Sequence, residues 1–444
     1  MNNIAALKRT RLAPGIAEAF WAAMPMLVAA LILTTLLLTF APFSAGSVIV
    51  DPNAAGGNKL NQIGYSLLGA IAIAALATLA KPERLVKIPT FGWGVVICFY
   101  LLAVMHSPDK GVALRAMMFS FVAVIAMVSV IILAKDERAL QNILATACLT
   151  VLTMCYFGVF AMPEAARHTA EIFEPANEGL WRGVYQHKNI AGPVMAAFVF
   201  AGVYLLRSGR RKLGLALTIM ALFFLLQSGS KTSAGTVFLV LSIILLPSAL
   251  GMRGLGVALF AIVMLLFAVF TLGTVLFEPV NHFVQSIAPG TNYTGRVTLW
   301  EFSLGLIQKQ PLFGYGLESL WGKPVLLEME RPYDSEWDFR GIVHGHSGYL
   351  DAVLDLGIPG ALAVFFVVII QPTVDYLRTR RLRSNILAAD FFMMIVVFTA
   401  LNAFMETFFF RRGDPVWMLM VLAVAGLRLT ATTPLNSADR KSVV

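Results

Sequence analysis

The chain has 444 residues, of which 58% are hydrophobic and only 13% are charged. Soluble domains usually carry about 25% charged residues, so this composition excludes an ordinary soluble protein. The net charge of +9 would suit a nucleic-acid-binding protein, but the positive residues lie in short loops between apolar runs and follow membrane topology instead. We expect an all-α membrane protein that crosses the bilayer many times.

About twelve apolar runs are long enough to be considered as spans, since a crossing helix needs about 20 residues. They lie near 18–42, 61–80, 91–106, 111–134, 138–162, 189–206, 213–228, 233–250, 254–277, 348–377, 386–408 and 414–430. The runs at 91–106 and 213–228 are short for a span, and the run at 348–377 is too long for one. Gly357 and Pro359 are expected to divide it into a short helix and a full one.

Most basic residues lie in alternate loops between the apolar runs. They gather in every second loop, at 8–11, 81–87, 135–138, 207–212, 253 and 378–383. Cytoplasmic loops of membrane proteins are enriched in Lys and Arg, so both termini are predicted to be cytoplasmic. The polar interval at 278–346 then lies outside, in the periplasm of a Gram-negative cell. We expect one transmembrane domain over 1–444, with 278–346 as its single large periplasmic loop.

The external interval contains a predicted amphipathic helix near 296–309. Val297, Trp300, Leu304 and Ile307 recur there at helical spacing. The helix either lies on the membrane as a lid or forms a structural cap, and the sequence does not separate the two.

Several cations stand on the predicted outer side, against the general charge pattern. They are Arg115, then Arg182 and Lys188 in the run WRGVYQHKN, Lys231 in the run QSGSKTS, Arg296 after Thr294-Gly295, and Arg411 and Arg412. Ionisable groups at membrane depth are costly and usually face a cavity with a partner. Guanidinium groups match phosphate oxygens, and helix N-termini add backbone donors. The set indicates a lipid-linked phosphate or pyrophosphate ligand; the alternative for each cation is pairing with an acid or with lipid headgroups.

Two histidines, His344 and His346, end the polar interval where the next apolar run begins. A neutral imidazole near pH 7 suits a base that takes a proton from a hydroxyl. The alternatives are a hydrogen-bonded structural residue or a pair of metal ligands. No outer cysteine or clear third ligand accompanies the histidines, and the external loop has no Asp-x-Asp motif, so neither a metal nor a cofactor is expected.

Three carboxylates near this boundary have two interpretations each. Asp351 and Asp355 are one helical turn apart after His346, so they either orient a histidine or bind a cation, or they follow the preference for acids at helix starts. Glu406 lies late in a predicted span, five residues before Arg411. It is either part of an intramembrane ion pair or a residue of the site.

The order of the motifs resembles that of the O-antigen ligase and Wzy-type polysaccharide polymerase superfamily. The run at 182–192 is similar to the family motif that opens a mid-chain helix, and 228–232 to its Ser-rich basic motif. The runs at 294–300 and 311–316 resemble the start of the large external loop. The runs at 346–350 and 357–360 resemble the motif that closes it. The resemblance covers about 180–410, and it differs in having His346-Ser347 where the family commonly has His-Asn.

This resemblance implies a membrane glycosyltransferase with a GT-C-like fold in the bacterial inner membrane. Its donor would be a glycan on undecaprenyl pyrophosphate, its acceptor a glycan or lipid A-core, and the transfer metal-independent and inverting. The family's functional histidine corresponds to His346, with His344 as the alternative. The residues implied for binding pyrophosphate or glycan are Arg182, Lys188, Lys231, Arg296 and Arg412.

Three functions remain open at the level of sequence. The runs at 187–189 and 230–232 slightly favour a polymerase of lipid-linked repeat units over a ligase that moves finished O-antigen onto lipid A-core. A transporter or flippase of lipid-linked glycans is the alternative of another class. Transporters often contain paired repeats and broken helices at the bilayer midplane, whereas these motifs gather at one face and no repeat is evident.

Overall fold

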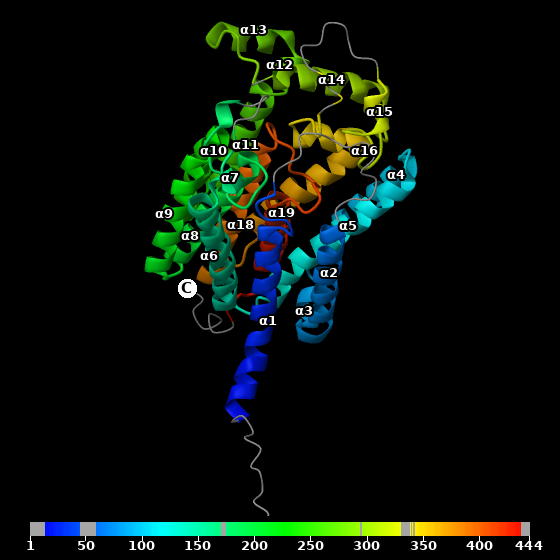
Figure 1. Ribbon diagram of the computed structural model, residues 1–444. Coiled ribbons are helices and arrows are strands. Elements are labelled where there is room, and N and C mark those ends of the chain that lie inside the picture. Colours follow the sequence, from blue (N-terminus) through cyan, green and yellow to red (C-terminus); the bar gives the residue numbers. More distant parts are fainter. Residues whose placement is uncertain are drawn as a thin grey trace, which may run out of the picture.

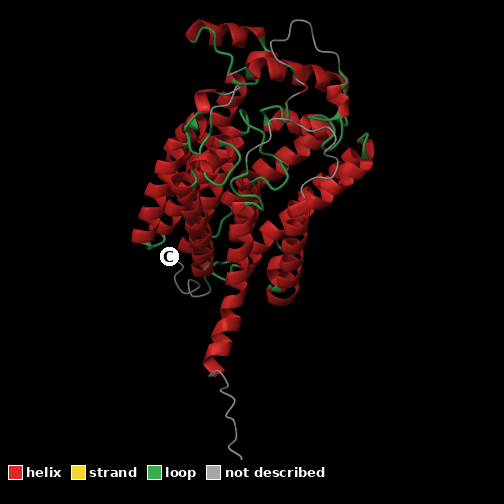
Figure 2. Cartoon of the chain, in the orientation of Figure 1, coloured by secondary structure: helices red, strands yellow, loops and turns green. Residues whose placement is uncertain are grey.

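The computed structural model describes residues 14–44, 59–169, 175–293, 295–329, 338, 340 and 342–436. Helices dominate this part of the chain, and no strand occurs within it (Figure 2). Ten of its helices are long and apolar enough to cross a membrane. Helices suit this setting because each satisfies its own backbone hydrogen bonds in lipid. The prediction of a polytopic all-α membrane protein is therefore confirmed.

The helices follow the predicted runs closely. They are α1 (Pro14–Leu38), α2 (Lys59–Leu79), α3 (Pro82–Leu85), α4 (Phe91–His106), α5 (Lys110–Leu133), α6 (Glu137–Ala161), α7 (Pro163–Ala166), η1 (Pro175–Asn177), α8 (Lys188–Arg207), α9 (Arg211–Gln227), α10 (Lys231–Ala249), α11 (Arg253–Phe270), α12 (Gly273–Leu276), α13 (Glu278–Ile287), α14 (Arg296–Lys309), α15 (Pro324–Leu327), α16 (Gly348–Phe365), η3 (Phe366–Ile370), α17 (Gln371–Leu377), α18 (Arg383–Asn402) and α19 (Pro415–Thr432). The two short runs became α4 and α9, of 16 and 17 residues. At about 1.5 Å per residue, neither reaches the thickness of about 30 Å of a bilayer core.

The long helices form a bundle whose two ends differ (Figure 1). The start of α1, the short helix α3 and the C-terminal end of the described chain lie at one end. Helices α13, α14 and α15 of the interval 278–346 lie together at the opposite end. This arrangement separates the loop with Lys81, Arg84 and Lys87 from the polar motifs.

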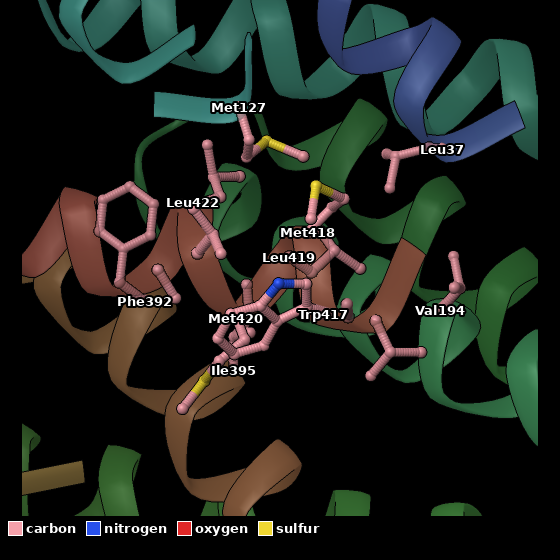
Figure 3. Packing of buried hydrophobic residues seen from close by; sticks show 14 of the residues in the cluster. Leu37, Met127, Val194, Phe392, Ile395, Trp417, Met418, Leu419, Met420 and Leu422 are labelled. Carbon is pink, nitrogen blue, oxygen red and sulfur yellow. The ribbon is translucent and has the colours of Figure 1, made fainter. Parts of the chain in front are cut away.

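Helices α18 and α19 form the centre of the bundle. Trp417 of α19 is 1% exposed and belongs to one apolar cluster with Val194 of α8 and residues of α5 and α18 (Figure 3). Cys148 and Cys155 are buried, whereas Cys98 is exposed on α4. Because these two central helices are almost wholly enclosed, they fix the position of the loop that joins them.

A buried polar network ties the central helices together near the end where α17 and α18 are connected. Asp390 is 0% exposed and accepts hydrogen bonds from Arg207 at 2.8 Å, Ser248 at 2.7 Å and Tyr376 at 2.9 Å. A charge in an apolar interior is tolerated only with such partners. The network joins α8, α10, α17 and α18 and therefore serves their packing.

The long run at 348–377 is broken at Gly357, as expected. Gly357 has φ 72° and ψ 172°, so the chain leaves the helical conformation there. The loop at 311–316 packs against the break: Tyr315 N donates to Leu354 O at 2.7 Å and Ile358 N to Pro311 O at 2.8 Å. The external loop thereby supplies partners to backbone groups beside the kink.

Replacing Gly357 by alanine is expected to displace this loop. The added Cβ would lie 2.1 Å from Leu312 O, and the positive φ is unfavourable for any L side chain. We expect a loss of stability of about 2 kcal/mol or more, measured as a lower melting temperature of the purified protein. Gly305 of α14 has nothing within 4 Å of its Cβ position, so Gly305→Ala is the matched control. Equal melting temperatures for the two variants would contradict the packing described.

A helix forms at the predicted residues as α14, but of the predicted apolar stripe only Trp300 is buried, and the buried positions are Leu299, Trp300, Ser303 and Leu306. Trp300 is 0% exposed and Leu306 is 2% exposed. Leu306 shares a small apolar cluster with Leu354 of α16 and with Leu320 and Leu326 of the external loop. The structural cap is therefore the interpretation that the structure favours over a helix lying on the membrane.

Candidate active site

Glu406, in the loop between α18 and α19, is the centre of a polar cluster. Its Oε1 accepts hydrogen bonds from Arg296 Nη2 at 2.6 Å and Asn189 Nδ2 at 2.7 Å. Its Oε2 lies 3.2 Å from His346 Nδ1. Only 14% of the carboxylate side chain is exposed. One carboxylate thus joins segments at the starts of α8, α14 and α16, and we call these four residues the Glu406 cluster.

The partners of Glu406 are brought together because several helices begin at this end of the bundle. Helix α8 starts at Lys188, α10 at Lys231, α14 at Arg296 and α16 at Gly348. The first turn of a helix leaves N–H groups without intrahelical partners and carries a partial positive charge. Cationic first residues add to that potential. This end of the molecule is consequently suited to a negatively charged ligand.

The basic motifs at 181–192 and 227–233 lie against each other. A Cβ at Gly192 would lie 2.5 Å from Ser230 Cβ. Trp181 N donates to Gln227 O at 3.2 Å. The close approach at Gly192 places the exposed Lys231, at the start of α10, beside the helix that carries Asn189.

Arg182 is buried and holds a turn of the chain. The residue is 6% exposed. Its guanidinium donates to the backbone carbonyls of Ser44 at 3.0 Å, Tyr185 at 3.0 Å, Arg167 at 3.3 Å and Gln186 at 3.4 Å. Direct binding of pyrophosphate by Arg182 stays a prediction. The geometry favours an organising role, in which Arg182 shapes the segment leading into α8.

Arg412 forms its ion pair with Glu318 and not with Glu406. Its guanidinium forms a bidentate ion pair with Glu318 of the external loop, at 2.8 and 2.9 Å. Its neighbour Arg411 lies 3.9 Å from Asp414. Arg412 therefore ties the loop after α18 to the external loop, and phosphate binding by it also stays a prediction.

His346 is held by both its backbone and its ring. The residue has φ 49°, a left-handed conformation that is unfavourable for a side-chain-bearing residue. Its carbonyl accepts a hydrogen bond from Trp300 Nε1 at 3.4 Å. The side chain is 31% exposed. Strain of this kind at a polar boundary is typical of a residue placed for function.

The charge on Glu406 determines which nitrogen of His346 carries the proton. Burial raises the pKa of Glu406, but the hydrogen bond and charge of His346, with the charge of Arg296, outweigh it and hold the pKa below its ordinary value. An ionised carboxylate only accepts hydrogen bonds, so His346 Nδ1 must donate. In the neutral ring, Nε2 then bears the lone pair. His346 is thereby prepared to accept a proton at Nε2.

His344 lies against His346 with ring centroids 4.2 Å apart, in an edge-on arrangement. Its Nδ1 is buried and has no hydrogen-bond partner. Burial holds the pKa of His344 well below its ordinary value, and nearby His346, Arg411 and Arg296 lower it further. His344 therefore stays neutral. Among the described residues, no group of three His, Cys, Asp or Glu side chains is placed to hold a metal ion.

The lowered pKa of His344 predicts acid sensitivity of the fold. In the unfolded chain the ring protonates near its ordinary pKa of about 6.5, whereas the folded protein resists protonation. Below about pH 6.5 the unfolded state binds more protons, so stability falls as the pH falls. His344→Asn should lessen the drop in melting temperature between pH 7 and pH 5. The exposed His282 of α13 provides the control, His282→Asn; identical pH profiles for all three proteins would refute the prediction.

Sequence reasoning singled out Arg296 and His346, left Glu406 open between an ion pair and a residue of the site, and did not select Asn189. Helix α18 ends at Asn402, so Glu406 lies in a loop and not late in a span as expected. Its ion-pair partner is Arg296, 110 residues away, and not a neighbour in sequence. The available signal was a lone acid within an apolar, Phe-rich segment, since such acids usually have a partner elsewhere.

Ser347, which follows His346, and Asp351, a candidate for orienting a histidine, both have other contacts. Ser347 caps α16 by accepting a hydrogen bond from Leu350 N. Asp351 accepts hydrogen bonds from Gly345 N at 3.1 Å and Trp321 Nε1 at 2.8 Å. Asp351 therefore fixes the turn between the two histidines, while Glu406 orients the ring of His346.

Residues 196–365 match the family model described as O-antigen ligase. The matched segment contains Lys231, Arg296 and His346, whereas Asn189 and Glu406 lie outside it. No curated protein matches the chain. The match confirms the resemblance inferred from the order of the motifs.

Proposed function

We propose that this chain, whose residues 196–365 match the O-antigen ligase family, transfers a glycan from undecaprenyl pyrophosphate to a sugar hydroxyl. The family match and the many apolar helices support a multi-pass protein of the bacterial inner membrane with a function of the O-antigen ligase or polymerase type. The observation that carries the specific proposal is the Glu406 cluster. There a carboxylate, an imidazole and a guanidinium stand together at the starts of three helices.

His346 acts as the base in the proposed reaction. Its Nε2 accepts the proton of the acceptor hydroxyl as that oxygen attacks the anomeric carbon of the donor. The bond from this carbon to the pyrophosphate oxygen breaks, its electron pair stays on the pyrophosphate, and attack from the opposite side inverts the configuration. Glu406 acts through His346: it keeps Nδ1 protonated and stabilises the imidazolium that forms.

Cations stabilise the departing pyrophosphate. Arg296 opens α14 with 17% of its side chain exposed, and Lys188 and Lys231 open α8 and α10. Fixed positive groups placed where negative charge develops lower the barrier without rearranging during the reaction. These cations supply that stabilisation without a metal ion in the proposed mechanism. Arg182 contributes by shaping the segment that ends at Lys188.

Reconstitution tests this function directly. The purified protein would be placed in liposomes with an undecaprenyl-pyrophosphate-linked glycan and EDTA, with and without lipid A-core. Longer lipid-linked chains from the donor alone identify a polymerase, which the runs at 187–189 and 230–232 slightly favour. Glycosylated lipid A-core identifies a ligase. If neither product formed and the labelled donor crossed the bilayer unchanged, the protein would be a transporter and the proposed transfer would be wrong.

The proposed orientation places both termini in the cytoplasm and the Glu406 cluster in the periplasm. It is supported by the positions of basic residues, which gather at 81–87, 207–212 and 378–383, in loops alternate to those of the polar motifs. The interval 278–346 is then the large periplasmic loop of a single transmembrane domain.

A further inference from the structure

A cavity of about 450 Å³ adjoins the Glu406 cluster on the side of His344. Its walls come from the start of α2, from α5 and α16, and from the segments at 318–321 and 407–412. The ring of His344 forms part of the wall and contacts the ring of His346. The volume falls within the range of about 300–1,000 Å³ typical of small-ligand sites. A molecule in this cavity would therefore contact His344, whose ring lies against that of the proposed base.

The lining differs in charge from the cationic helix starts. It includes the carboxylates of Glu318, Asp351 and Asp355 and the aromatic rings of Trp321 and Phe410. Arg411 and Arg412 also line it, but Arg412 is already paired with Glu318. Carboxylates accept hydrogen bonds from hydroxyl groups, and aromatic rings pack against apolar C–H faces. These walls suit a hydroxyl-rich sugar ring.

Two polar groups of the wall are without partners. Asp351 is engaged with Gly345, Trp321 and Thr407. By contrast, the carboxylate of Asp355 has no hydrogen bond to any residue that the structure describes. His344 Nδ1 is buried and likewise unpaired. Asp355 lines the cavity, so a ligand there that donates hydrogen bonds would supply a partner for its carboxyl group, whereas the buried His344 Nδ1 is not accessible to such a ligand.

We infer that this cavity is the acceptor subsite, which binds the sugar ring whose hydroxyl is glycosylated. The inference rests on the proposed glycosyl transfer and adds to it a separate place for the second substrate. Asp355 accepts hydrogen bonds from the ring hydroxyls, and the aromatic residues pack against its C–H face. The attacking hydroxyl is thereby directed toward His346. Lipid A-core and the terminal sugar of a lipid-linked glycan both have this chemistry.

Binding and transfer by two cavity variants test the inference. Asp355→Asn replaces one carboxyl oxygen by an NH2 group while preserving shape, so an acceptor becomes a donor, and Val343→Trp adds bulk at a half-exposed position of the wall. Full-length protein in nanodiscs would be titrated, without donor, with labelled lipid A-core, with the glycan released from the lipid-linked donor, and with glycan-free undecaprenyl pyrophosphate. Both variants should weaken binding of one of the two sugar probes about ten- to a hundredfold. Undecaprenyl pyrophosphate should bind all proteins equally.

The control is Glu278→Gln, an exposed acid of α13 outside the cavity. The sugar probe that the cavity variants weaken identifies the source of the acceptor. Unchanged binding of both sugar probes, or equal weakening of all three ligands, would overturn the inference. Transfer is measured on the same proteins: failure of the wild type to transfer refutes the proposed function, whereas normal transfer with an unaltered acceptor KM in Asp355→Asn refutes only the acceptor subsite.

Discussion

Removal of the His346 imidazole is expected to lower the rate of glycan transfer by about 10²- to 10⁴-fold while the protein stays folded and inserted. The variants are His346→Ala and His346→Asn. Asparagine is the sharper choice because it tolerates the left-handed backbone at this position and its amide can still donate to Glu406. The carboxylate of Glu406 also keeps Arg296 and Asn189 as partners, so the substitution leaves no buried charge without a partner. Initial rates of transfer in liposomes measure the effect.

The matched control for this experiment is His282→Asn, since His282 lies exposed on α13. Elution as a single species and an unchanged melting temperature would show that the His346 variants fold. If His346→Asn kept more than about a tenth of the wild-type rate, His346 would not be the base, because a positioned base contributes at least about a hundredfold.

Glu406→Gln is expected to lower kcat by about 10³- to 10⁴-fold with a much smaller change in KM for the donor. The substitution keeps the size of the side chain but replaces one carboxylate oxygen by an NH2 group, which donates hydrogen bonds. Opposite that amide, His346 Nδ1 must become the acceptor, so the proton moves to Nε2 and the base is lost. Loss of the correct tautomer costs about 10⁴-fold in serine proteases. Steady-state kinetics with a soluble acceptor analogue measure the two constants.

A purely structural role for Glu406 would give a different result. Glu406→Asp restores the charge on a shorter side chain, so it should recover part of the activity that Glu406→Gln loses. If both variants lost activity and melting temperature to the same extent, Glu406 would act only through packing. If Glu406→Gln kept wild-type kcat, the proposed tautomer control would be wrong.

Much of the fold was readable from sequence because its determinants are local. Apolar runs defined the spans, and Gly357 with Pro359 marked the break in α16. Helix ends were less certain, since the apolar residues Phe404 and Phe408 continue beyond the end of α18 at Asn402. Hydropathy counts such residues as part of the span, whereas the backbone has already turned into the loop that carries Glu406.

The site was only partly readable because charge pairing is not local. Arg296 and His346 stood out as polar groups at a membrane boundary. Their shared partner lies 110 and 60 residues away in sequence, a distance that no motif spacing encodes. The same limit applies to Arg412, whose partner Glu318 is 94 residues earlier. A list of unpaired ions can be drawn from a sequence, but only packing decides which of them meet.

The position of Glu406 in the chain also sets an order of events during synthesis. Translation proceeds from the N-terminus at about 5–20 residues per second, so Asn189, Arg296 and His346 leave the ribosome before their common partner. Until residue 406 emerges, the guanidinium and the imidazole have no shared counter-charge. A chain arrested earlier would contain the whole segment 196–365 that carries the family match and still lack the centre of its site. If Glu406 acts as proposed, products that end before residue 406 are expected to be inactive however well their spans insert.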